Sequence, residues 1–126
     1  MSAGRRSIRV GEQLLRELAD LLEHKVRDPR VRRVTLTRVS LSNDLRFARV
    51  YYSALEEGRD LTQVQEGLES AKGFMKREIG VRLDLRYIPE LAFRHDPSLE
   101  HGEYMERLLR DLRPEGSLEE DGSGEK

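Results

Sequence analysis

Four arginines that fall together around Pro29 have the clearest capacity for chemistry: Arg27, Arg30, Arg32 and Arg33. An arginine side chain is planar and permanently charged, and it can donate two parallel hydrogen bonds to one phosphate group. The cluster indicates nucleic-acid binding about as strongly as it indicates the alternative, a solvated face whose arginines pair with nearby acids. Those acids are Asp20, Glu23 and Asp28.

The net charge of −1 conceals a separation of charges along the chain. Residues 1–53 include twelve basic and six acidic residues, which give this part a charge of +6. Residues 114–126 include five acidic residues and one lysine, which give the end of the chain a charge of −4. The acidic tail thus hides a basic half that is suited to a polyanion such as RNA.

A second group of candidate side chains follows the predicted third strand: His95, Asp96, His101 and Glu103. Histidine and carboxylate groups are zinc ligands, but this spacing matches no common zinc pattern. The chain also has no cysteine that could complete such a site. We therefore predict a solvated loop here and no metal site.

Sequence motifs for catalysis are absent. The chain contains no Gly-x-Ser-x-Gly elbow for a serine nucleophile and no Gly-x-x-x-x-Gly-Lys loop for phosphates. The adjacent pair Glu56-Glu57 lies in a polar connection, where solvated charge explains it better than acid-base catalysis does. We predict that the protein is not an enzyme and that it uses no cofactor and no small-molecule substrate.

Length and composition predict a single domain in the cytoplasm. A chain of 126 residues can bury one modest core. It has no apolar run of about 18 residues, and no apolar stretch follows its basic amino terminus, so neither a membrane span nor an export signal is predicted. The lack of cysteine agrees with a reducing compartment.

Hydrophobic periodicity predicts the first half of the fold. Apolar residues recur at helical spacing over residues 7–26, whose first residue, a serine, is the predicted N-cap. The pair Asp28-Pro29 ends this helix. Two β-rich runs, 31–41 and 45–54, flank Ser42-Asn43-Asp44, a segment that tolerates the left-handed backbone of a turn. A helix and a β-hairpin are therefore predicted.

The second half predicts another helix and a third strand. Residues 61–79 show three-and-four spacing of apolar side chains, with Gly73 inside the helix and Gly80 at its predicted C-cap. Residues 81–93 alternate apolar and charged types, as a half-buried strand does, with a bend at Pro89.

These elements divide the chain into three parts. Residues 1–6 are predicted to be a flexible basic arm, and residues 7–113 to be one domain that ends in a short helix at 103–112. Residues 114–126 are acidic and poor in apolar types, so they are predicted to be a disordered tail. The predicted fold class is α+β, with helices over a three-stranded sheet.

The middle of the second predicted helix resembles a known family. Ser70-Ala71-Lys72-Gly73 joins two predicted helical halves, and the order of elements resembles a type II KH domain, which normally clamps single-stranded nucleic acid with a Gly-x-x-Gly loop. The first glycine is missing here, and Ala71-Lys72-Gly73 instead resembles the Ala-x-Gly kink of the ribosome-binding factor A family. Other resembling stretches, between about residues 8 and 112, are Asp28-Pro29-Arg30, Ser42 with Asp44-Leu45, Ala48, Val50, Tyr51, Ile88-Pro89-Glu90-Leu91, Phe93, Asp96, Ser98 and Gly102.

The resemblance implies a bacterial cytoplasmic factor that binds the ribosomal RNA of the small subunit without catalysing a reaction. Such a factor assists late maturation of the subunit, including processing of the 5′ end of its RNA, and supports growth in the cold. We expect it to act as a monomer, with the small ribosomal subunit and its RNA as partners and no membrane partner. The missing Gly-x-x-Gly clamp favours recognition of folded RNA shape. The alternative left open is a protein-interaction module without direct RNA binding.

The residues themselves predict where RNA binds. A helix pair with its kink at Ala71, Lys72 and Gly73 offers basic side chains to a phosphate backbone, and the arginines nearer the amino terminus widen the footprint. The predicted RNA-binding residues are Arg5, Arg6, Arg9, Arg30, Arg32, Arg33, Lys72, Lys76 and Arg77.

Overall fold

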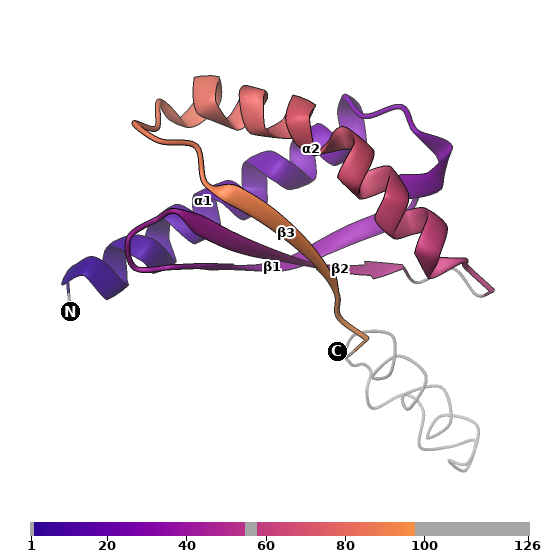
Figure 1. The fold of residues 1–126 in the computed structure, drawn as a ribbon, viewed down its shortest axis with the longest axis horizontal. Coiled ribbons are helices and arrows are strands. Elements are labelled where there is room, and N and C mark those ends of the chain that lie inside the picture. Colours follow the sequence, from indigo (N-terminus) through magenta and orange to yellow (C-terminus); the bar gives the residue numbers. More distant parts are fainter. Residues whose placement is uncertain (1, 55–57, 98–126) are drawn as a thin grey trace, which may run out of the picture. The chain divides into compact units, whose positions relative to one another are not determined.

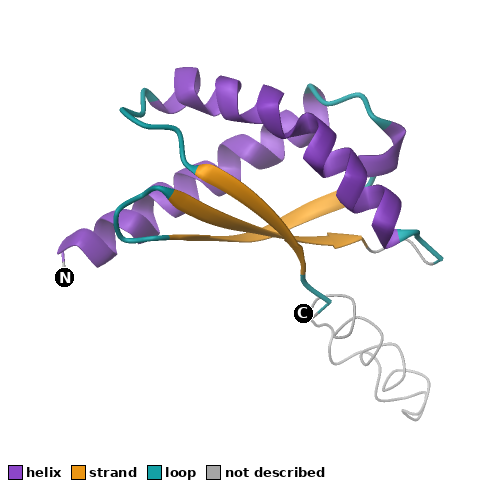
Figure 2. Cartoon of the chain, in the orientation of Figure 1, coloured by secondary structure: helices purple, strands orange, loops and turns teal. Residues whose placement is uncertain are grey.

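The computed structural model describes residues 2–54 and 58–97 (Figure 1). Both helices lie on one side of a three-stranded sheet (Figure 2). The predicted α+β class, with helices over three strands, is confirmed. The elements in chain order are α1 (Ser2–His24), the 3-10 helix η1 (Pro29–Val31), β1 (Val34–Leu41), β2 (Phe47–Ala54), α2 (Leu61–Leu83) and β3 (Glu90–His95).

Strand β2 is the centre of the sheet, between β1 and β3. It pairs antiparallel with β1 and parallel with β3. Parallel neighbours need a long crossover connection, and α2 supplies it here. Strand β2 is therefore the one strand of this sheet that pairs with both β1 and β3.

The predicted hairpin is confirmed at Ser42 to Asp44. The Ser42 hydroxyl donates to Oδ1 of Asp44 at 2.7 Å, and the same Oδ1 accepts from the backbone N–H of Arg46 at 3.1 Å. Strand β1 starts at Val34, three residues after the predicted start, because Pro29–Val31 forms η1. Asp28 caps η1 by accepting from the backbone N–H of Arg30 at 2.9 Å.

Helix α1 begins at Ser2, so it includes residues 2–6 of the predicted basic arm. The flexibility of that arm stays a prediction. Arg5 and Arg6 are good helix formers and extend the helix toward the amino terminus. Ser7 does not cap the helix, because it lies within α1, five residues after its start. Its side chain is buried, and its Oγ lies 3.5 Å from Oδ1 of Asn43 in the hairpin turn. This contact joins the residue that directly follows the predicted arm to the hairpin turn.

Helix α2 is one continuous helix from Leu61 to Leu83, which corrects the predicted helix pair. Its ribbon changes direction near the middle of the helix (Figure 2). Gly80 lies inside α2, and the C-cap is Asp84, whose φ of 52° is left-handed. The detailed likeness to a type II KH domain stays a prediction.

Strand β3 begins at Glu90, whereas the sequence predicts a strand from residue 81. Val81 is in α2 and is 80% exposed, and Tyr87 is 69% exposed, so the alternation of residues 81–87 does not mark a half-buried strand. The chain instead folds back onto the end of α2. A Cβ on Gly80 would lie 2.8 Å from Cδ1 of Ile88, so the absence of a side chain makes room for this return.

The hydrophobic core lies between the sheet and the two helices. Tyr52 of β2 is buried and faces this core. Gln65 of α2 accepts a hydrogen bond from the Tyr52 hydroxyl at 2.7 Å and donates to the Phe93 carbonyl at 3.1 Å, so it joins α2 to two strands. The fully or nearly fully buried apolar residues include Leu14, Leu18, Leu21, Val50, Val64, Leu68, Met75, Ile79, Leu91 and Phe93.

Candidate nucleic-acid interface

The segment from Lys25 to Val31 packs against the middle of α2. Gly67 permits this contact, because a Cβ at that position would lie 2.8 Å from Cγ1 of Val31 and 3.0 Å from Cβ of Arg30. A shallow groove remains between the segment and the helix, and we call it the loop groove. Its lining residues are Lys25, Val26, Arg27, Asp28, Pro29, Ser70, Ala71 and Phe74.

Arg30 links the two sides of the loop groove. Its Nη2 lies 2.6 Å from Oδ2 of Asp28 and donates to the Ser70 hydroxyl at 3.3 Å. Its Nη1 lies 3.9 Å from Oε1 of Glu66. The hydrogen bond from Arg30 lowers the pKa of Asp28, and Asp28 in turn raises the pKa of Arg30. Arg30, a predicted phosphate contact, is thus already paired with carboxylates.

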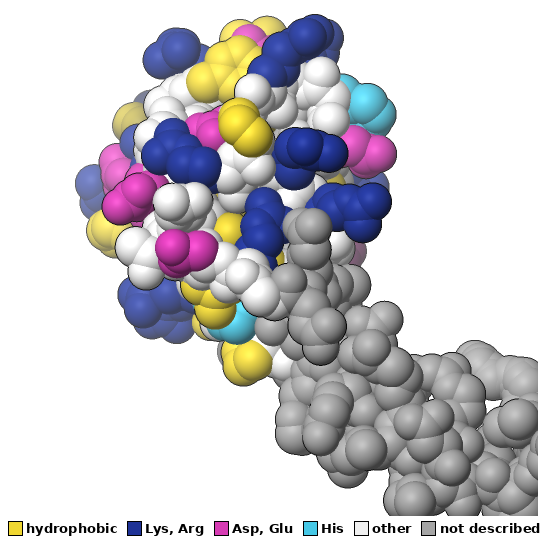
Figure 3. Space-filling model, turned by 90° about the vertical axis from the view of Figure 1, so that its right-hand side faces the viewer, with side chains coloured by type: hydrophobic (Ala, Val, Ile, Leu, Met, Phe, Trp, Pro, Cys, Tyr) yellow, Lys and Arg dark blue, Asp and Glu magenta, His cyan; other side chains and the backbone are white. Residues whose placement is uncertain are grey.

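Lys25 and Arg27 are exposed at the rim of the loop groove, where they can meet a phosphate. Figure 3 shows several Lys and Arg side chains on the face that includes this end of the domain. Neither residue is in the predicted RNA-binding set, although Arg27 belongs to the sequence cluster around Pro29. Membership of that cluster was the feature of the sequence that could have identified Arg27 as a candidate contact.

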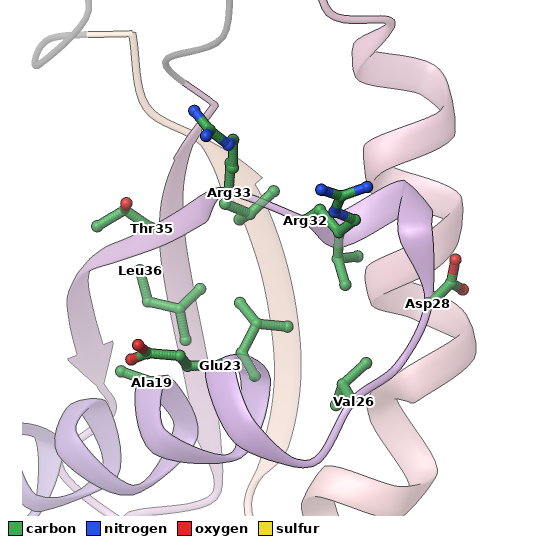
Figure 4. Close-up of a pocket in the computed structure, with 11 residues that line it drawn as sticks. Ala19, Glu23, Val26, Asp28, Arg32, Arg33, Thr35 and Leu36 are labelled. Atoms are coloured by element: carbon green, nitrogen blue, oxygen red, sulfur yellow. The ribbon is translucent and has the colours of Figure 1, made fainter.

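Arg32 and Arg33 are exposed beyond the loop groove, at a second hollow between the end of α1, η1 and the start of β1. Their guanidinium groups point away from α1 (Figure 4). Apolar side chains such as Val26 and Leu36 line this hollow together with Glu23. Arg33 has a left-handed backbone with φ of 63°, which directs the chain from η1 into β1.

The three basic residues predicted to bind RNA on the second helix have different surroundings in the structure. Lys72 pairs with Glu69 at 2.7 Å, and Lys76 pairs with Glu90 of β3 at 2.8 Å. Lys76, and more weakly Lys72, lower the pKa of Glu90, so both lysines lie on the β3 side of α2. Arg77 is exposed, and its Nη1 would lie 3.6 Å from a Cβ on Gly73.

Arg5, Arg6 and Arg9 are exposed on the first half of α1. The amino terminus of α1 and the segment before β1 lie at opposite ends of the domain (Figure 1). The predicted RNA-binding residues therefore do not form one patch. The structure brings Arg30 to Ser70 in the middle of α2 and leaves the amino-terminal arginines apart (Figure 1).

Gly67 is a further residue of this site that the sequence analysis did not single out. Gly73 is exposed, and a Cβ there would meet only the flexible end of Arg77, so no close approach requires that glycine. The signal for Gly67 is its place on the stripe of α2 that also carries Ala71, one turn later. A small residue on such a stripe permits a neighbouring segment to approach.

Within residues 2–54 and 58–97, no helix is long and apolar enough to cross a membrane. The same residues contain no group of three or more side chains placed to hold a metal ion. Of the four candidate ligands, His95 and Asp96 follow one another at the end of β3. His101 and Glu103 lie outside the described residues, as do the predicted helix at 103–112 and the predicted tail at 114–126.

Solved structures resemble this fold. The crystal structure of ribosome-binding factor A from Thermus thermophilus aligns with a TM-score of 0.63 and 27% identity, over 71% of this chain and 94% of that one. A solution NMR structure from Thermotoga maritima aligns with a TM-score of 0.63 and 35% identity, over 71% and 85% of the two chains. A homology model of the T. thermophilus factor, fitted into a cryo-electron microscopy map of its 30S complex, aligns with a TM-score of 0.60 and 26% identity, over 72% and 96%.

Sequence comparison identifies the family. Ribosome-binding factor A of Staphylococcus saprophyticus is 46% identical over 107 residues, which are 85% of this chain and 94% of that protein. Ribosome-binding factor A of Staphylococcus carnosus is 44% identical over 107 residues, or 85% and 93% of the two chains. The family model described as Ribosome-binding factor A matches residues 6–109. The chain therefore belongs to the ribosome-binding factor A family.

Proposed function

We propose that this protein binds the small ribosomal subunit as a non-enzymatic assembly factor and contacts its RNA through the loop groove. The observation that carries the proposal is the groove itself, in which exposed cations flank half-buried apolar side chains. The T. thermophilus relative fitted into a map of a 30S complex supports the choice of partner.

The chemistry of the loop groove suits RNA. Lys25 and Arg27 supply positive charge at its rim, and Ala71 and Phe74 supply an apolar surface on which a base can stack. Asp28 would repel a phosphate if its carboxylate were alone, but Arg30 holds that carboxylate in an ion pair. The side of the groove formed by α2 is a helix and not a flexible loop, which favours recognition of folded RNA shape.

The specific role in maturation of the small subunit is proposed from the family resemblance. We propose that the protein acts in the cytoplasm as a monomer and assists late maturation of the small subunit, including processing of the 5′ end of its RNA. Its own contribution is binding, since neither the motifs of the sequence nor the side chains of the loop groove supply a nucleophile with an adjacent base. Cutting of the RNA is then left to another protein.

The test is the affinity for isolated small subunits measured over a range of salt concentrations. Each cation that neutralises a phosphate releases condensed counterions, so affinity falls as salt rises. Losing one contact makes the plot of log affinity against log salt less steep, by about 0.7 to 0.9 in the magnitude of its slope. We expect this decrease for Arg27→Gln. The matched control is Arg16→Gln, which removes an equal charge from an exposed position of α1 outside the groove.

Equal salt slopes for wild type, Arg27→Gln and Arg16→Gln would contradict RNA binding at the loop groove. Retention on subunits that does not weaken with salt would favour a protein-interaction module instead. Circular dichroism of each variant confirms that a change in slope does not come from unfolding.

A further inference from the structure

The face of the sheet opposite the helices presents its own set of side chains. Along β2, Ala48, Val50 and Tyr52 are buried against the helices, so the alternating residues Arg49 and Tyr51 point to the other face. We call that face the open face of the sheet. It is separate from the loop groove, which lies on the helical side.

Three residues form a row across the open face: Arg38 of β1, Tyr51 of β2 and Arg94 of β3. Tyr51 is paired with Arg38 on one side and with Arg94 on the other. The guanidinium carbon of Arg38 lies 4.0 Å from the centroid of the Tyr51 ring. Both arginines are exposed. An aromatic ring on the central strand is thus flanked by a cation on each neighbouring strand.

A β-bulge in β1 places Arg38 on the open face. Leu36 pairs with Tyr52, but Arg38 pairs with Tyr51, so Thr37 is the extra residue. The Thr37 hydroxyl donates to the Tyr51 carbonyl at 3.3 Å. In a regular strand, Leu36 and Arg38 would lie on the same face, because side chains alternate with a period of two. The bulge allows Leu36 to enter the core while Arg38 covers Tyr51.

The charge of the open face is positive. Arg49 lies in the next row, paired with Ser40 and Ala92. Among the described residues of the three strands, Glu90 is the one acidic residue, and its carboxylate is engaged by Lys76 of α2 at 2.8 Å. Three arginines around a half-buried tyrosine complement an anionic ligand that also has flat rings to stack.

We infer that the open face binds a single-stranded segment of RNA, with one base stacked on Tyr51. Stacking of bases on aromatic rings combined with a basic surface is the usual basis of single-strand binding. The base takes the place of the Arg38 guanidinium on the ring, and Arg38 and Arg94 then contact the phosphates on either side. The inference shares with the proposed function only the choice of RNA as ligand, because it assigns a different surface and a different form of RNA.

The chain has no tryptophan, which permits a direct test. Tyr51→Trp introduces the single tryptophan of the variant on the open face, where a stacked base quenches its fluorescence. The matched control is Tyr87→Trp, because Tyr87 likewise lies beside an arginine, with the Arg86 guanidinium carbon 5.5 Å from the ring centroid, and is exposed to the oligonucleotide. Each variant is titrated with a single-stranded RNA of about twelve nucleotides.

We expect saturable quenching of Trp at position 51 and none at position 87. We also expect Tyr51→Leu and Arg94→Gln to weaken binding of the oligonucleotide about five-fold or more, and Arg16→Gln to leave it nearly unchanged. Absent quenching at position 51, or equal quenching at both positions, would overturn the inference. Quenching by RNA-free proteins of the small subunit, with none by the oligonucleotide, would assign the open face to a protein and also overturn it.

The loop-groove variant separates this inference from the proposed function. If Arg27→Gln lowers the salt slope for small subunits while Tyr51→Leu and Arg94→Gln bind the oligonucleotide as wild type does, only the open-face inference fails. If Arg27→Gln leaves that slope unchanged while Trp at position 51 is quenched, RNA binding at the loop groove is contradicted and RNA binding at the open face is supported.

Discussion

Gly67 of α2 lies directly against Val31 of η1, so that a Cβ on the glycine would be 2.8 Å from Cγ1 of the valine. Real Cβ atoms do not approach another carbon so closely, and valine cannot easily move a branched side chain. This contact holds the segment before β1 against α2 and so forms the loop groove. Gly73, six residues later, has open space around it apart from the end of Arg77.

The first prediction concerns the stability of the two glycine variants. Alanine is the better helix former by about 1 kcal/mol, so Gly73→Ala should be as stable as wild type or more stable. Gly67→Ala should lose about 1 to 3 kcal/mol, because overpacking against Val31 outweighs that gain. Urea unfolding measures both. A Gly67→Ala protein as stable as Gly73→Ala would show that η1 moves away from α2 at little cost.

The second prediction concerns the bend in α2. Glycine weakens a helix locally, and alanine at position 73 favours a straighter helix. We expect Gly73→Ala to remain folded but to bind isolated small subunits more weakly, because the segments of α2 on either side of the bend would present their side chains at a changed angle. Co-sedimentation gives the affinity, and circular dichroism reports the fold. An unchanged binding curve for the folded variant would mean that the bend has no role in binding.

The third prediction concerns pH and the contact between the helices. Arg82 Nη1 of α2 lies 2.8 Å from Oε1 of Glu17 and 2.8 Å from Oδ2 of Asp20, both of α1. Hydrogen bonds from Arg82, and then from His24, lower the pKa of Asp20. A lowered pKa in the folded state stabilises the fold above the ordinary pKa, and the stabilisation is lost as pH falls through the lowered value.

Arg82→Gln should therefore unfold at lower urea concentration than wild type near neutral pH, and the difference should narrow below about pH 4. The difference should be small, because the carboxylates are accessible to solvent. Arg16→Gln serves as the control for loss of one positive charge. A difference between Arg82→Gln and wild type that is equally wide in acid would assign the effect to packing of the Arg82 side chain and not to ionised carboxylates.

The fourth prediction compares two basic residues of α2. Lys76 is engaged by Glu90 at 2.8 Å, whereas Arg77 is exposed on the same helix. Arg77→Gln should lower the salt slope for binding to small subunits by about 0.7 to 0.9 if Arg77 neutralises one phosphate. Lys76→Gln should change the slope less, because releasing Lys76 to a phosphate would leave Glu90 without its partner. The reverse order of the two slopes would place the RNA on the β3 side of α2.

The elements that repeat a local pattern were predictable from the sequence. The apolar residues Leu14, Leu18 and Leu21 recur at helical spacing and are all buried in α1. The hairpin turn at Ser42 to Asp44 follows from residues that favour its backbone conformation. Each of these signals depends on neighbours within a few positions, so no knowledge of the tertiary structure is needed to read it.

The elements that the sequence predicted wrongly depend on contacts between distant segments. Val81 alternates with charged residues as a strand would, but it extends α2 until the chain turns back at Asp84. The chain can fold back onto α2 after Asp84 because Ile88 packs against Gly80, which has no side chain. Ser7, the predicted N-cap, likewise lies inside α1 and contacts Asn43, 36 residues away.

The composition and motifs of the sequence by themselves indicated the family, the α+β class and an arginine-rich surface, because residue types and their local spacing carry that information. Which arginines are available to RNA was decided only by the tertiary structure. Arg30 and Arg27 look alike in the sequence, but folding places Arg30 between Asp28 and Ser70 and leaves Arg27 at the rim of the loop groove. Arg38 reaches Tyr51 only because a bulge shifts the register of β1 by one residue. Charge is a property of the residue, whereas its neutralisation depends on which distant side chains the packed fold brings within a few ångströms.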